Sequence, residues 1–282
     1  MNNLKTSATL SAVVPLIEPH VRFFSTLLQN IELQTKRFDE IILVASGLSE
    51  GSLELVSRDL LSSTYSKAFR ILSNSIFPSG KNRNIGAKAT TSELVLFLDA
   101  DDTYHPLRNA AVLEVFARTN FDALMTRSFP LPESVPFDWN SNFNVENWAA
   151  SYLIEPSEVF DRTFASGRKR HKEMLGAPSV VSAPPETGNL SVLHHGHMAV
   201  RRSVFTELNQ HEQSFPRNED SVFARDILWS GRRLYILNVP LSHYRTDSSS
   251  NNPKNGSLLN ILSAVPTAFL CSPVSHKGMR PS

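Results

Sequence analysis

The stretch Leu94–Asp102, with the sequence LVLFLDADD, indicates the fold class of this chain. Its five apolar residues, Leu94–Leu98, form a short continuous run, which is typical of a strand buried on both faces of a parallel sheet. Three carboxylates, Asp99, Asp101 and Asp102, follow within four positions. Open α/β sheets bind their ligands at the carboxyl ends of strands, so a ligand site is expected here.

The chemistry of this acidic cluster leaves two interpretations open. Asp99 and Asp101 are two positions apart, so both can face one crevice at the strand end. Carboxylate oxygens suit Mg2+ or Mn2+, and such an ion keeps open positions for substrate phosphates. The alternative is a solvated turn in which Asp102 or Thr103 caps the next helix.

Strands and helices alternate through the first 100 residues. The predicted strands are Ala12–Ile17, Glu40–Ala45 and Phe69–Ser73, and the predicted helices are His20–Leu33, Leu53–Leu60 and Lys81–Ala89. This alternation predicts a parallel sheet wrapped by helices. A helix over Leu107–Arg118, with Pro106 at its first position, and a strand over Ala123–Thr126 should follow the acids.

The second half is less regular. From Arg127 to Leu190 the periodicity weakens, and prolines and aromatic residues interrupt it. Order returns with a strand over Met198–Val200, helices over Ser203–Leu208 and after Glu219-Asp220, and a last strand over Leu234–Val239.

Composition excludes several classes of protein. The chain has 282 residues, 41% of them hydrophobic, and a net charge of +1, so no strong field favours nucleic acid. A single cysteine, Cys271, excludes an internal disulfide framework and a cysteine metal cluster. The polar N-terminus lacks the apolar core of a signal peptide, and no apolar run is long enough to span a membrane. We expect a cytoplasmic location, with peripheral membrane association left open.

Four blocks in order resemble the family 2 glycosyltransferases, which have a GT-A fold. These blocks are AVVP at Ala12–Pro15, RNIGA at Arg83–Ala87, FLDADD at Phe97–Asp102 followed by His105-Pro106, and GHMAVRRSVF at Gly196–Phe205 followed by Glu219-Asp220 and Gly231. The resemblance implies a mostly parallel, Rossmann-like sheet flanked by helices, with an acceptor-side α+β half. Residues 1–126 would bind a nucleotide-sugar donor, 127–246 would bind the acceptor and carry the chemistry, and 247–282 would form a tail.

The resemblance also implies an activity and its partners. It implies a metal-dependent, inverting glycosyltransferase that moves a sugar from a nucleotide-diphosphate sugar, UDP-linked by preference or GDP-linked, to a hydroxyl of a glycan, lipid-linked or small-molecule acceptor. Mn2+ or Mg2+ would stabilise the departing diphosphate. The implied metal ligands are Asp101, Asp99 and His243. The residues implied at the donor are Pro15, Glu18, Ser46, Arg83, Asn84, Asp99, Ala100 and Arg245.

Some of these roles have alternatives. Asp220, with Glu219 beside it, matches the family's general base, and the alternative is that Asp220 caps its helix. Arg83 could pair with phosphate or fix its helix to the strand end through Asp99. Gly86 would allow close approach of helix and strand. His197 is interpreted as a wall of the acceptor site.

The sequence departs from the family at two donor positions. The usual Asp at the end of the second strand is replaced by Ala45-Ser46, and Glu18 stands where the first strand usually has an Asn. A non-catalytic sugar-nucleotide or glycan-binding relative therefore remains an alternative. A nucleotidyltransferase is a second alternative, but it would normally have glycines in Pro15–His20, where none occur.

Overall fold

The fold is known from a computed structural model that describes residues 8–74, 79–131, 153–154, 181–182, 189–190, 195–208, 220, 223, 227 and 230–245. The longer strands are β1 (Leu10–Ile17), β2 (Glu40–Ser46), β3 (Phe69–Asn74), β4 (Leu94–Phe97), β6 (Ala123–Leu131), β10 (Met198–Arg201) and β11 (Leu234–Arg245). Short strands are β5 (Thr103–Tyr104), β7 (Leu153–Ile154), β8 (Val181–Ser182) and β9 (Asn189–Leu190). The helices are η1 (Glu18–Phe23), α1 (Phe24–Glu32), α2 (Glu50–Ser62), α3 (Ser79–Ala89), α4 (Arg108–Arg118), η5 (His195–His197) and α7 (Arg202–Leu208).

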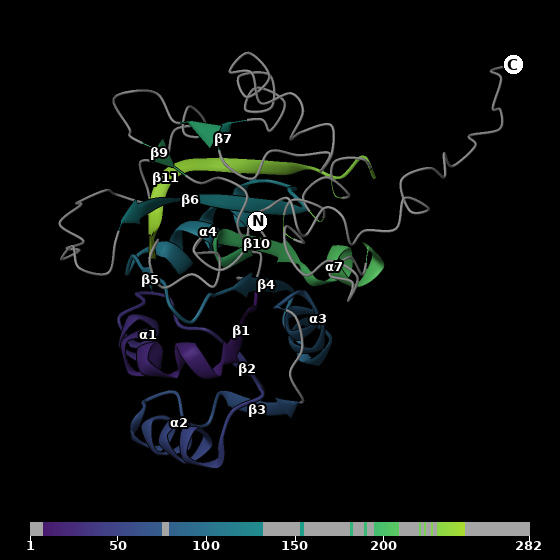
Figure 1. Ribbon diagram of the computed structural model, residues 1–282. Coiled ribbons are helices and arrows are strands. Elements are labelled where there is room, and N and C mark those ends of the chain that lie inside the picture. Colours follow the sequence, from purple (N-terminus) through teal and green to yellow (C-terminus); the bar gives the residue numbers. More distant parts are fainter. Residues whose placement is uncertain are drawn as a thin grey trace, which may run out of the picture.

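One sheet passes through both halves of the chain. Its order is β3-β2-β1-β4-β10-β6-β11-β5, with β7 on β11 (Figure 1). The pairs β1–β2, β2–β3, β1–β4 and β6–β11 are parallel, whereas β10 runs antiparallel to both β4 and β6. The expected mostly parallel α/β fold is confirmed. The division expected at residue 126 falls inside β6, so strands from both halves share this sheet.

Helices cover both faces of the sheet because the strands are apolar on both sides. In β4, Leu94 and Leu96 belong to the core that includes residues of α1, α2 and α4. Val95 and Phe97 belong to the core that includes residues of α3 and α7. Figure 1 shows α1 and α2 on one side of the sheet and α3 and α7 on the other. This two-sided burial explains the continuous apolar run in the sequence.

Gly86 allows α3 to lie close to the sheet, as expected. A Cβ atom on Gly86 would lie closer than 3.0 Å to Cγ1 of Val13 and 3.1 Å from Cγ2 of Val44. Both valines are fully buried in β1 and β2. Any larger side chain here would therefore push α3 away from the sheet.

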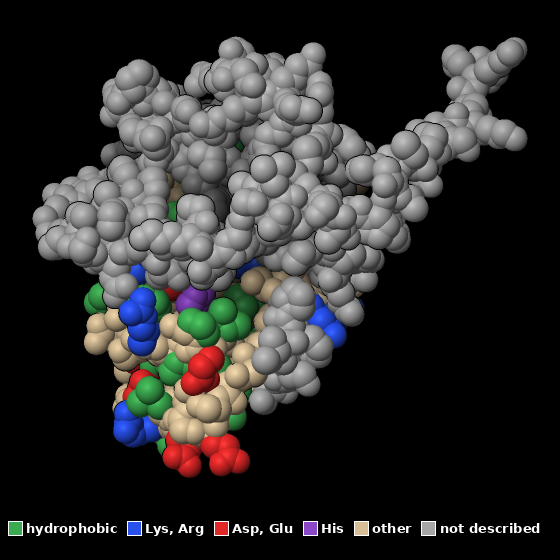
Figure 2. All heavy atoms as spheres, viewed as in Figure 1, with side chains coloured by type: hydrophobic (Ala, Val, Ile, Leu, Met, Phe, Trp, Pro, Cys, Tyr) green, Lys and Arg blue, Asp and Glu red, His purple; other side chains and the backbone are tan. Residues whose placement is uncertain are grey.

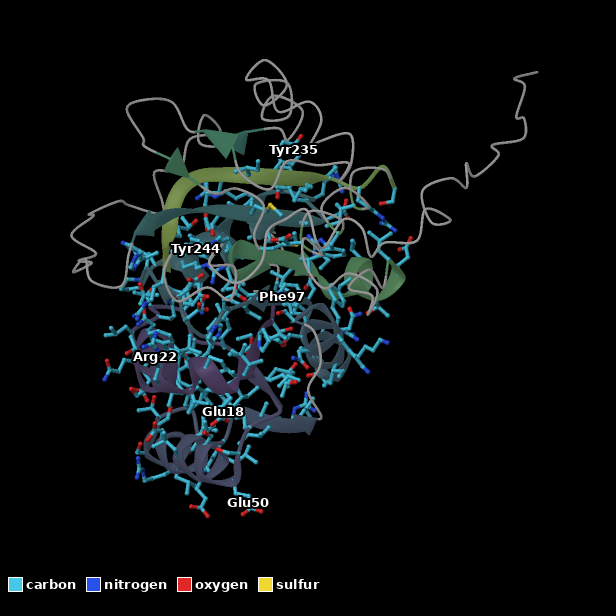
Figure 3. The ribbon with its side chains drawn as sticks, viewed as in Figure 1. Glu18, Arg22, Glu50, Phe97, Tyr235 and Tyr244 are labelled. Atoms are coloured by element: carbon cyan, nitrogen blue, oxygen red, sulfur yellow. The ribbon has the colours of Figure 1, made fainter. Side chains whose placement is uncertain are left out.

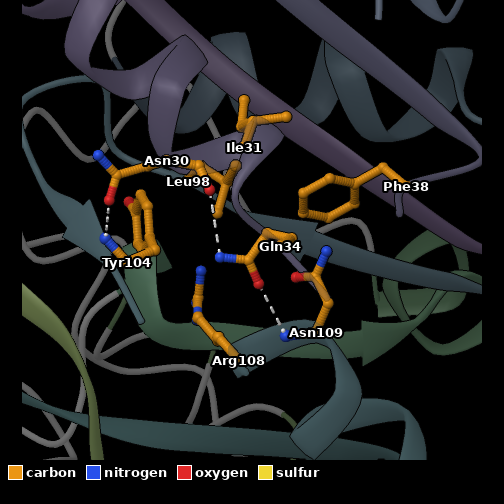
Figure 4. Close-up of a pocket in the computed structure, with 8 residues that line it drawn as sticks. All are labelled: Asn30, Ile31, Gln34, Phe38, Leu98, Tyr104, Arg108 and Asn109. Atoms are coloured by element: carbon orange, nitrogen blue, oxygen red, sulfur yellow. Dashed lines mark hydrogen bonds between the residues drawn. The ribbon is translucent and has the colours of Figure 1, made fainter. Parts of the chain in front are cut away.

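Helix α1 fixes the segment that follows the acids. Asn30 Oδ1 accepts a hydrogen bond from the Tyr104 backbone N–H at 2.8 Å. Gln34, two residues after α1, accepts from the Asn109 N–H at 3.1 Å (Figure 4). It also donates to the His105 carbonyl at 2.9 Å. Because these amide side chains take the place of water for buried backbone groups, the turn after β4 is held to α1.

Several expected boundaries differ from the structure. The predicted helix from His20 is a 3-10 turn, η1, before α1 begins at Phe24. Helix α4 begins at Arg108 with Leu107 as its N-cap, so the helix-start position expected for Pro106 and the N-cap role considered for Asp102 or Thr103 are wrong. β6 and β11 run beyond their predicted ends because long-range pairing with each other extends them.

Candidate functional site

The three carboxylates lie in a turn at the carboxyl end of β4, beside the end of β1. The Leu98 N–H donates to the Val13 carbonyl at 3.0 Å, which ties the start of the turn to β1. Asp101 is 6% exposed and Asp102 only 2% exposed. Buried carboxylates are unusual without a partner, so each must be accounted for.

Asp99 is held between α3 and η5. Arg83, which is buried in α3, forms an ion pair with Oδ1 of Asp99 through Nη2. On the other side, a Cβ atom added to Gly196 would lie 2.6 Å from Oδ2 of Asp99. The structure therefore brings together Arg83 and Asp99, as expected if Arg83 fixes its helix to the strand end. Gly196 leaves room for the Asp99 carboxylate.

Asp101 faces the turn after β1. Its Oδ1 lies 3.7 Å from Nδ1 of His20, whose side chain is 15% exposed. His20 belongs to η1, and Leu16 and Ile17 immediately precede that turn in β1. Asp101 is thus the carboxylate of the cluster that lies next to the carboxyl end of β1.

Asp102 is the most deeply buried of the three. Burial disfavours its charged form, and Asp101 and Asp99 repel it, so the pKa of Asp102 is raised well above its usual value. Its Oδ1 accepts a hydrogen bond from the Arg245 backbone N–H at 3.3 Å. A cation near the cluster would relieve the repulsion among the three carboxylates.

His197 lies below the acidic turn. Its Nδ1 is 2.7 Å from the Ser242 hydroxyl and its Nε2 is 3.9 Å from Oδ2 of Asp102. Ser242 and His197 are both fully buried, so this Ser-His-Asp arrangement does not offer substrate an accessible nucleophile. The expected place of His197 in the wall of the acceptor site stays a prediction.

His243 and Arg245 lie within β11 rather than on a loop after it. His243 pairs with Thr103 of β5, its Nδ1 is 3.4 Å from the Thr103 hydroxyl, and it is 3% exposed. The Arg245 guanidinium lies over the Phe23 ring, 4.6 Å from its centroid. Both residues therefore come close to the acidic turn because β11 is longer than the sequence suggested.

The other expected donor residues lie around the carboxyl ends of β1 and β2. Pro15 is buried in β1, and Ala100 is 1% exposed in the acidic turn. Ser46 ends β2, is 3% exposed, and pairs with Ile17 of β1. Asn84 is on α3, in the turn that also carries Arg83.

Glu18 is turned toward α2 (Figure 3). Its carboxylate accepts hydrogen bonds from the Ser52 hydroxyl at 2.7 Å and from the Ser49 N–H at 3.0 Å. The Ser52 bond and then the Ser49 backbone bond lower the pKa of Glu18. Because an anion stabilises the start of a helix, Glu18 has a structural role at α2 that the sequence did not predict.

Aromatic contacts connect the segment that contains Asp220 with β4. Asp220, Phe223 and Ile227 have helical backbone, while Glu219 is outside the described residues. The Phe223 ring packs edge-on against Phe205 of α7 at 5.2 Å, and Phe205 packs against Phe97 of β4 at 5.4 Å. Asp220 thus stands three positions before a residue that is anchored beside the strand that carries the acids.

The carboxylates of the acidic turn suit a divalent ion that binds together with substrate phosphates. Among the described residues no group of three or more His, Cys, Asp or Glu side chains forms a ready-made metal cage. Mg2+ is commonly bound by one or two carboxylates together with substrate phosphates and water. Asp101, near the mutually repelling Asp99 and Asp102, fits that arrangement.

Arg108 and Tyr104 are site residues that the sequence analysis missed. Arg108 is fully buried at the start of α4, and Tyr104 is 3% exposed in β5. The Tyr104 hydroxyl accepts from the Asp99 N–H at 2.6 Å and donates to the Asp99 carbonyl at 3.0 Å. No periodicity or motif in the sequence marks these two residues, because their partners are found only in the folded chain.

The face of the molecule in Figure 2 carries no uniform charge among its described residues. In the view of Figure 2, basic, acidic and apolar side chains are mixed, and acidic ones gather at the lower end over α2. None of the helices in the described ranges is long and apolar enough to cross a bilayer.

Comparison with known proteins identifies relatives. The family described as Glycosyl transferase family 2 matches residues 21–208, more than half of the chain. No curated protein matches it significantly. Among solved structures, S. aureus TarS 1–349 with UDP is 13% identical over 84% of this chain, with a TM-score of 0.54.

Two further structures share the fold. TarS 1–349 with UDP-GlcNAc is 14% identical, with a TM-score of 0.55, and the mannosyltransferase PcManGT from Pyrobaculum calidifontis with GDP-Man and Mn2+ is 17% identical, with a TM-score of 0.50. Each match covers 84% of this chain. The chain spans only 58–60% of the length of these three structures.

Proposed function

Because this chain belongs to glycosyl transferase family 2, we propose that it is a glycosyltransferase that takes its sugar from a nucleotide-diphosphate donor. The finer proposal is a metal-dependent transfer to an acceptor hydroxyl with inversion at the sugar carbon. One observation carries the proposal. Asp99, Asp101 and Asp102 gather at the carboxyl end of β4, where burial and mutual repulsion raise the pKa of Asp102.

A nucleotide diphosphate and its divalent ion would complement this cluster. Asp101 would be the direct ligand of Mn2+ or Mg2+, with Asp99 and His243 as the further candidates. When bound, the ion neutralises the charge that develops on the departing diphosphate. Arg83 and Arg245 supply fixed positive charge near the same turn, and Ser46, Pro15, Asn84, Glu18 and Ala100 are the proposed surroundings of the nucleotide.

Asp220 is the proposed general base. The acceptor hydroxyl must lose its proton as it attacks the sugar carbon, and a carboxylate is suited to accept that proton. The aromatic contacts from Phe223 through Phe205 to Phe97 support a place for this helix beside the acidic strand. Residues 1–126 and 127–246 remain the proposed donor and acceptor halves.

The structures of similar proteins guide the choice of donor. TarS is described with UDP and UDP-GlcNAc, and PcManGT with GDP-Man and Mn2+. The decisive experiment therefore measures binding of UDP- and GDP-sugars by calorimetry with Mn2+ and with EDTA. We expect one nucleotide series to bind only with the metal, and to raise the melting temperature by mass action.

Two variants separate the proposed roles. Asp101→Asn should abolish Mn2+-dependent donor binding, whereas Asp59→Asn, on α2, should leave it unchanged. Asp220→Asn should keep donor binding and lower transfer by about a hundredfold or more. Glu207→Gln, an exposed carboxylate on α7, is its control.

The outcomes also decide between the alternatives. Donor binding without transfer to any hydroxyl acceptor would favour the non-catalytic relative, for which the replacement at Ala45-Ser46 is the motivating feature. Metal-dependent release of pyrophosphate from a nucleoside triphosphate would favour a nucleotidyltransferase. Product anomers read by NMR test the inversion.

A further inference from the structure

Arg108 is a fully buried cation next to the candidate site. Its Nη2 donates to the Gly196 carbonyl at 2.7 Å, and its guanidinium lies over the Tyr104 ring at 4.6 Å from the centroid. Figure 4 shows the side chain directed toward Tyr104. Its Nε and Nη1 have no hydrogen-bond partner within the described part of the chain. Burial that leaves donors unsatisfied is costly, so the arrangement calls for an explanation.

Both partners of Arg108 touch Asp99. The Tyr104 hydroxyl is bonded to the N–H and the carbonyl of Asp99, at 2.6 and 3.0 Å. One Cα hydrogen of Gly196 faces the Asp99 carboxylate, since a Cβ atom in its place would be 2.6 Å from Oδ2. Arg108 thus connects the group that holds the backbone of Asp99 with the group that borders its side chain.

The charge of Arg108 also faces the acids. Burial lowers the pKa of Arg108 to about 10, and Tyr104, Asp102 and Asp99 act in the opposite direction. The guanidinium therefore stays charged at neutral pH. The same charge favours the ionised form of Asp102, against the effect of burial and of Asp101 and Asp99. Arg108 is a permanent counter-charge beneath the acidic turn.

We propose that Arg108 is a positioning residue that fixes the turn of Asp99, Asp101 and Asp102 against Gly196, so that the carboxylates keep one geometry for the donor. Its guanidinium does this with one planar group, which donates to the carbonyl and stacks on the ring at once. The identity of the ligand rests on the proposed function, whereas the fixing of the turn does not.

The test is Arg108→Lys in the full chain. Lysine keeps the charge but cannot both donate to Gly196 and stack on Tyr104. The control is Arg201→Lys, since Arg201 also donates to a carbonyl, that of Phe121 at 2.8 Å, and lies over an aromatic ring, but at the far end of β10. Arg108→Gln removes the charge as well, and melting curves report whether each variant is folded.

Amide hydrogen exchange is the first readout. Loss of a charge-assisted hydrogen bond should speed exchange in residues 99–104 and 196–198 by about tenfold or more in Arg108→Lys, and further in Arg108→Gln. The core strands β1 and β2 should exchange as in the wild type, and Arg201→Lys should leave the turn unchanged. Exchange raised equally throughout the sheet would show a general structural role and overturn the proposal.

Binding of UDP and GDP with Mn2+ is the second readout. The nucleotide should bind the wild-type protein about tenfold more tightly than it binds Arg108→Lys. Its affinity for Arg201→Lys should equal that for the wild type. Wild-type exchange in the turn of both Arg108 variants would refute the positioning role. If the wild type binds neither nucleotide, the proposed function fails, and the exchange result alone decides the role of Arg108.

Discussion

The close contact of Gly86 in α3 with β1 and β2 gives the sharpest prediction. In Gly86→Ala, the new Cβ would meet Cγ1 of Val13 at less than 3.0 Å and Cγ2 of Val44 at 3.1 Å. Carbon atoms in ordinary contact are about 3.5–4.0 Å apart, so α3 must move away from the sheet or the valines must shift. Neither valine has free space, because both are fully buried in paired strands.

The expected magnitude has two parts of opposite sign. Overpacking of this kind costs about 1–3 kcal/mol or more. Alanine in a helix is favoured over glycine by up to about 1 kcal/mol. We therefore expect Gly86→Ala to lower the free energy of unfolding by about 1–2 kcal/mol or more. Gly51→Ala in α2 has no atom within 4 Å of its new Cβ, so the same substitution should leave stability unchanged or raise it by about 0.5 kcal/mol.

Urea unfolding at neutral pH measures both variants against the wild type. Gly86→Ala should lower the midpoint, whereas Gly51→Ala should leave it unchanged or raise it slightly, with the same slope for both. Adding Val13→Ala to Gly86→Ala removes the clashing methyl groups, so the double variant should lose less stability than the sum of the two single losses. Equal midpoints for Gly86→Ala and Gly51→Ala, or additive losses in the double variant, would refute the packing argument.

Three further predictions concern the site and its supports. Gly196→Ala should displace the Asp99 carboxylate, because its new Cβ would lie 2.6 Å from Oδ2. We expect calorimetry to show about tenfold weaker binding of UDP–Mn2+ or GDP–Mn2+, with a cooperative melt retained. Undiminished binding would contradict this expectation. Gln34→Leu leaves the buried Asn109 N–H unpaired, whereas the His105 carbonyl keeps its hydrogen bond from the Arg108 N–H at 2.9 Å. The substitution should therefore cost about 1–3 kcal/mol in urea unfolding, and a loss below about 0.5 kcal/mol would show that another group replaces Gln34. Glu40 accepts hydrogen bonds from Ser11 at 2.7 Å and Arg70 at 2.8 Å; burial would raise its pKa, but the Thr91 N–H and its other hydrogen bonds lower it. Its ionised form therefore stabilises the fold above the usual value of 4.5, and this contribution is lost as pH falls through the lower folded pKa. Glu40→Gln should cost about 2 kcal/mol at pH 7, and the difference from wild type should shrink as the pH falls below the usual value of 4.5. A difference independent of pH would exclude a role for the charge.

The donor-side departures from the family acquire a physical meaning in the structure. Glu18, which stands where the family has an Asn, is engaged by Ser49 and Ser52 at the start of α2. Ser46, in place of an Asp, is 3% exposed at the end of β2. These two positions are therefore occupied by residues that suit the local fold. Because they do not identify the base of the donor, the nucleotide preference is the first property to measure.

β11 makes contacts with residues far away in the sequence, and these contacts join the two halves of the chain. Tyr235 stacks on Phe121 with ring centroids 3.9 Å apart, and the opposite end of the strand reaches β5 and the acidic turn. In Figure 3 the labelled Tyr235 and Tyr244 lie on this strand, far from Glu50 at the start of α2. β11 is therefore the element that carries His243 and Arg245 to the acids.

The sequence by itself determined the alternation of strands and helices and the place of the acidic turn. Both follow from short-range patterns: apolar runs of strand length, helical periodicity, and Asp99 directly after a buried strand. Gly86 and the Arg83–Asp99 ion pair could also be anticipated, because a helix preceding a parallel strand must pack beside its carboxyl end.

Only the tertiary structure decided the environment of the carboxylates. The antiparallel insertion of β10 between β4 and β6 brings Gly196 to Arg108, which is 88 residues away in the sequence. It also places Nε2 of His197 3.9 Å from Oδ2 of Asp102, a carboxylate that the sequence placed only in the acidic cluster or at a helix cap. The burial and pairing of charges depend on which distant segments come into contact, and local periodicity does not predict those contacts.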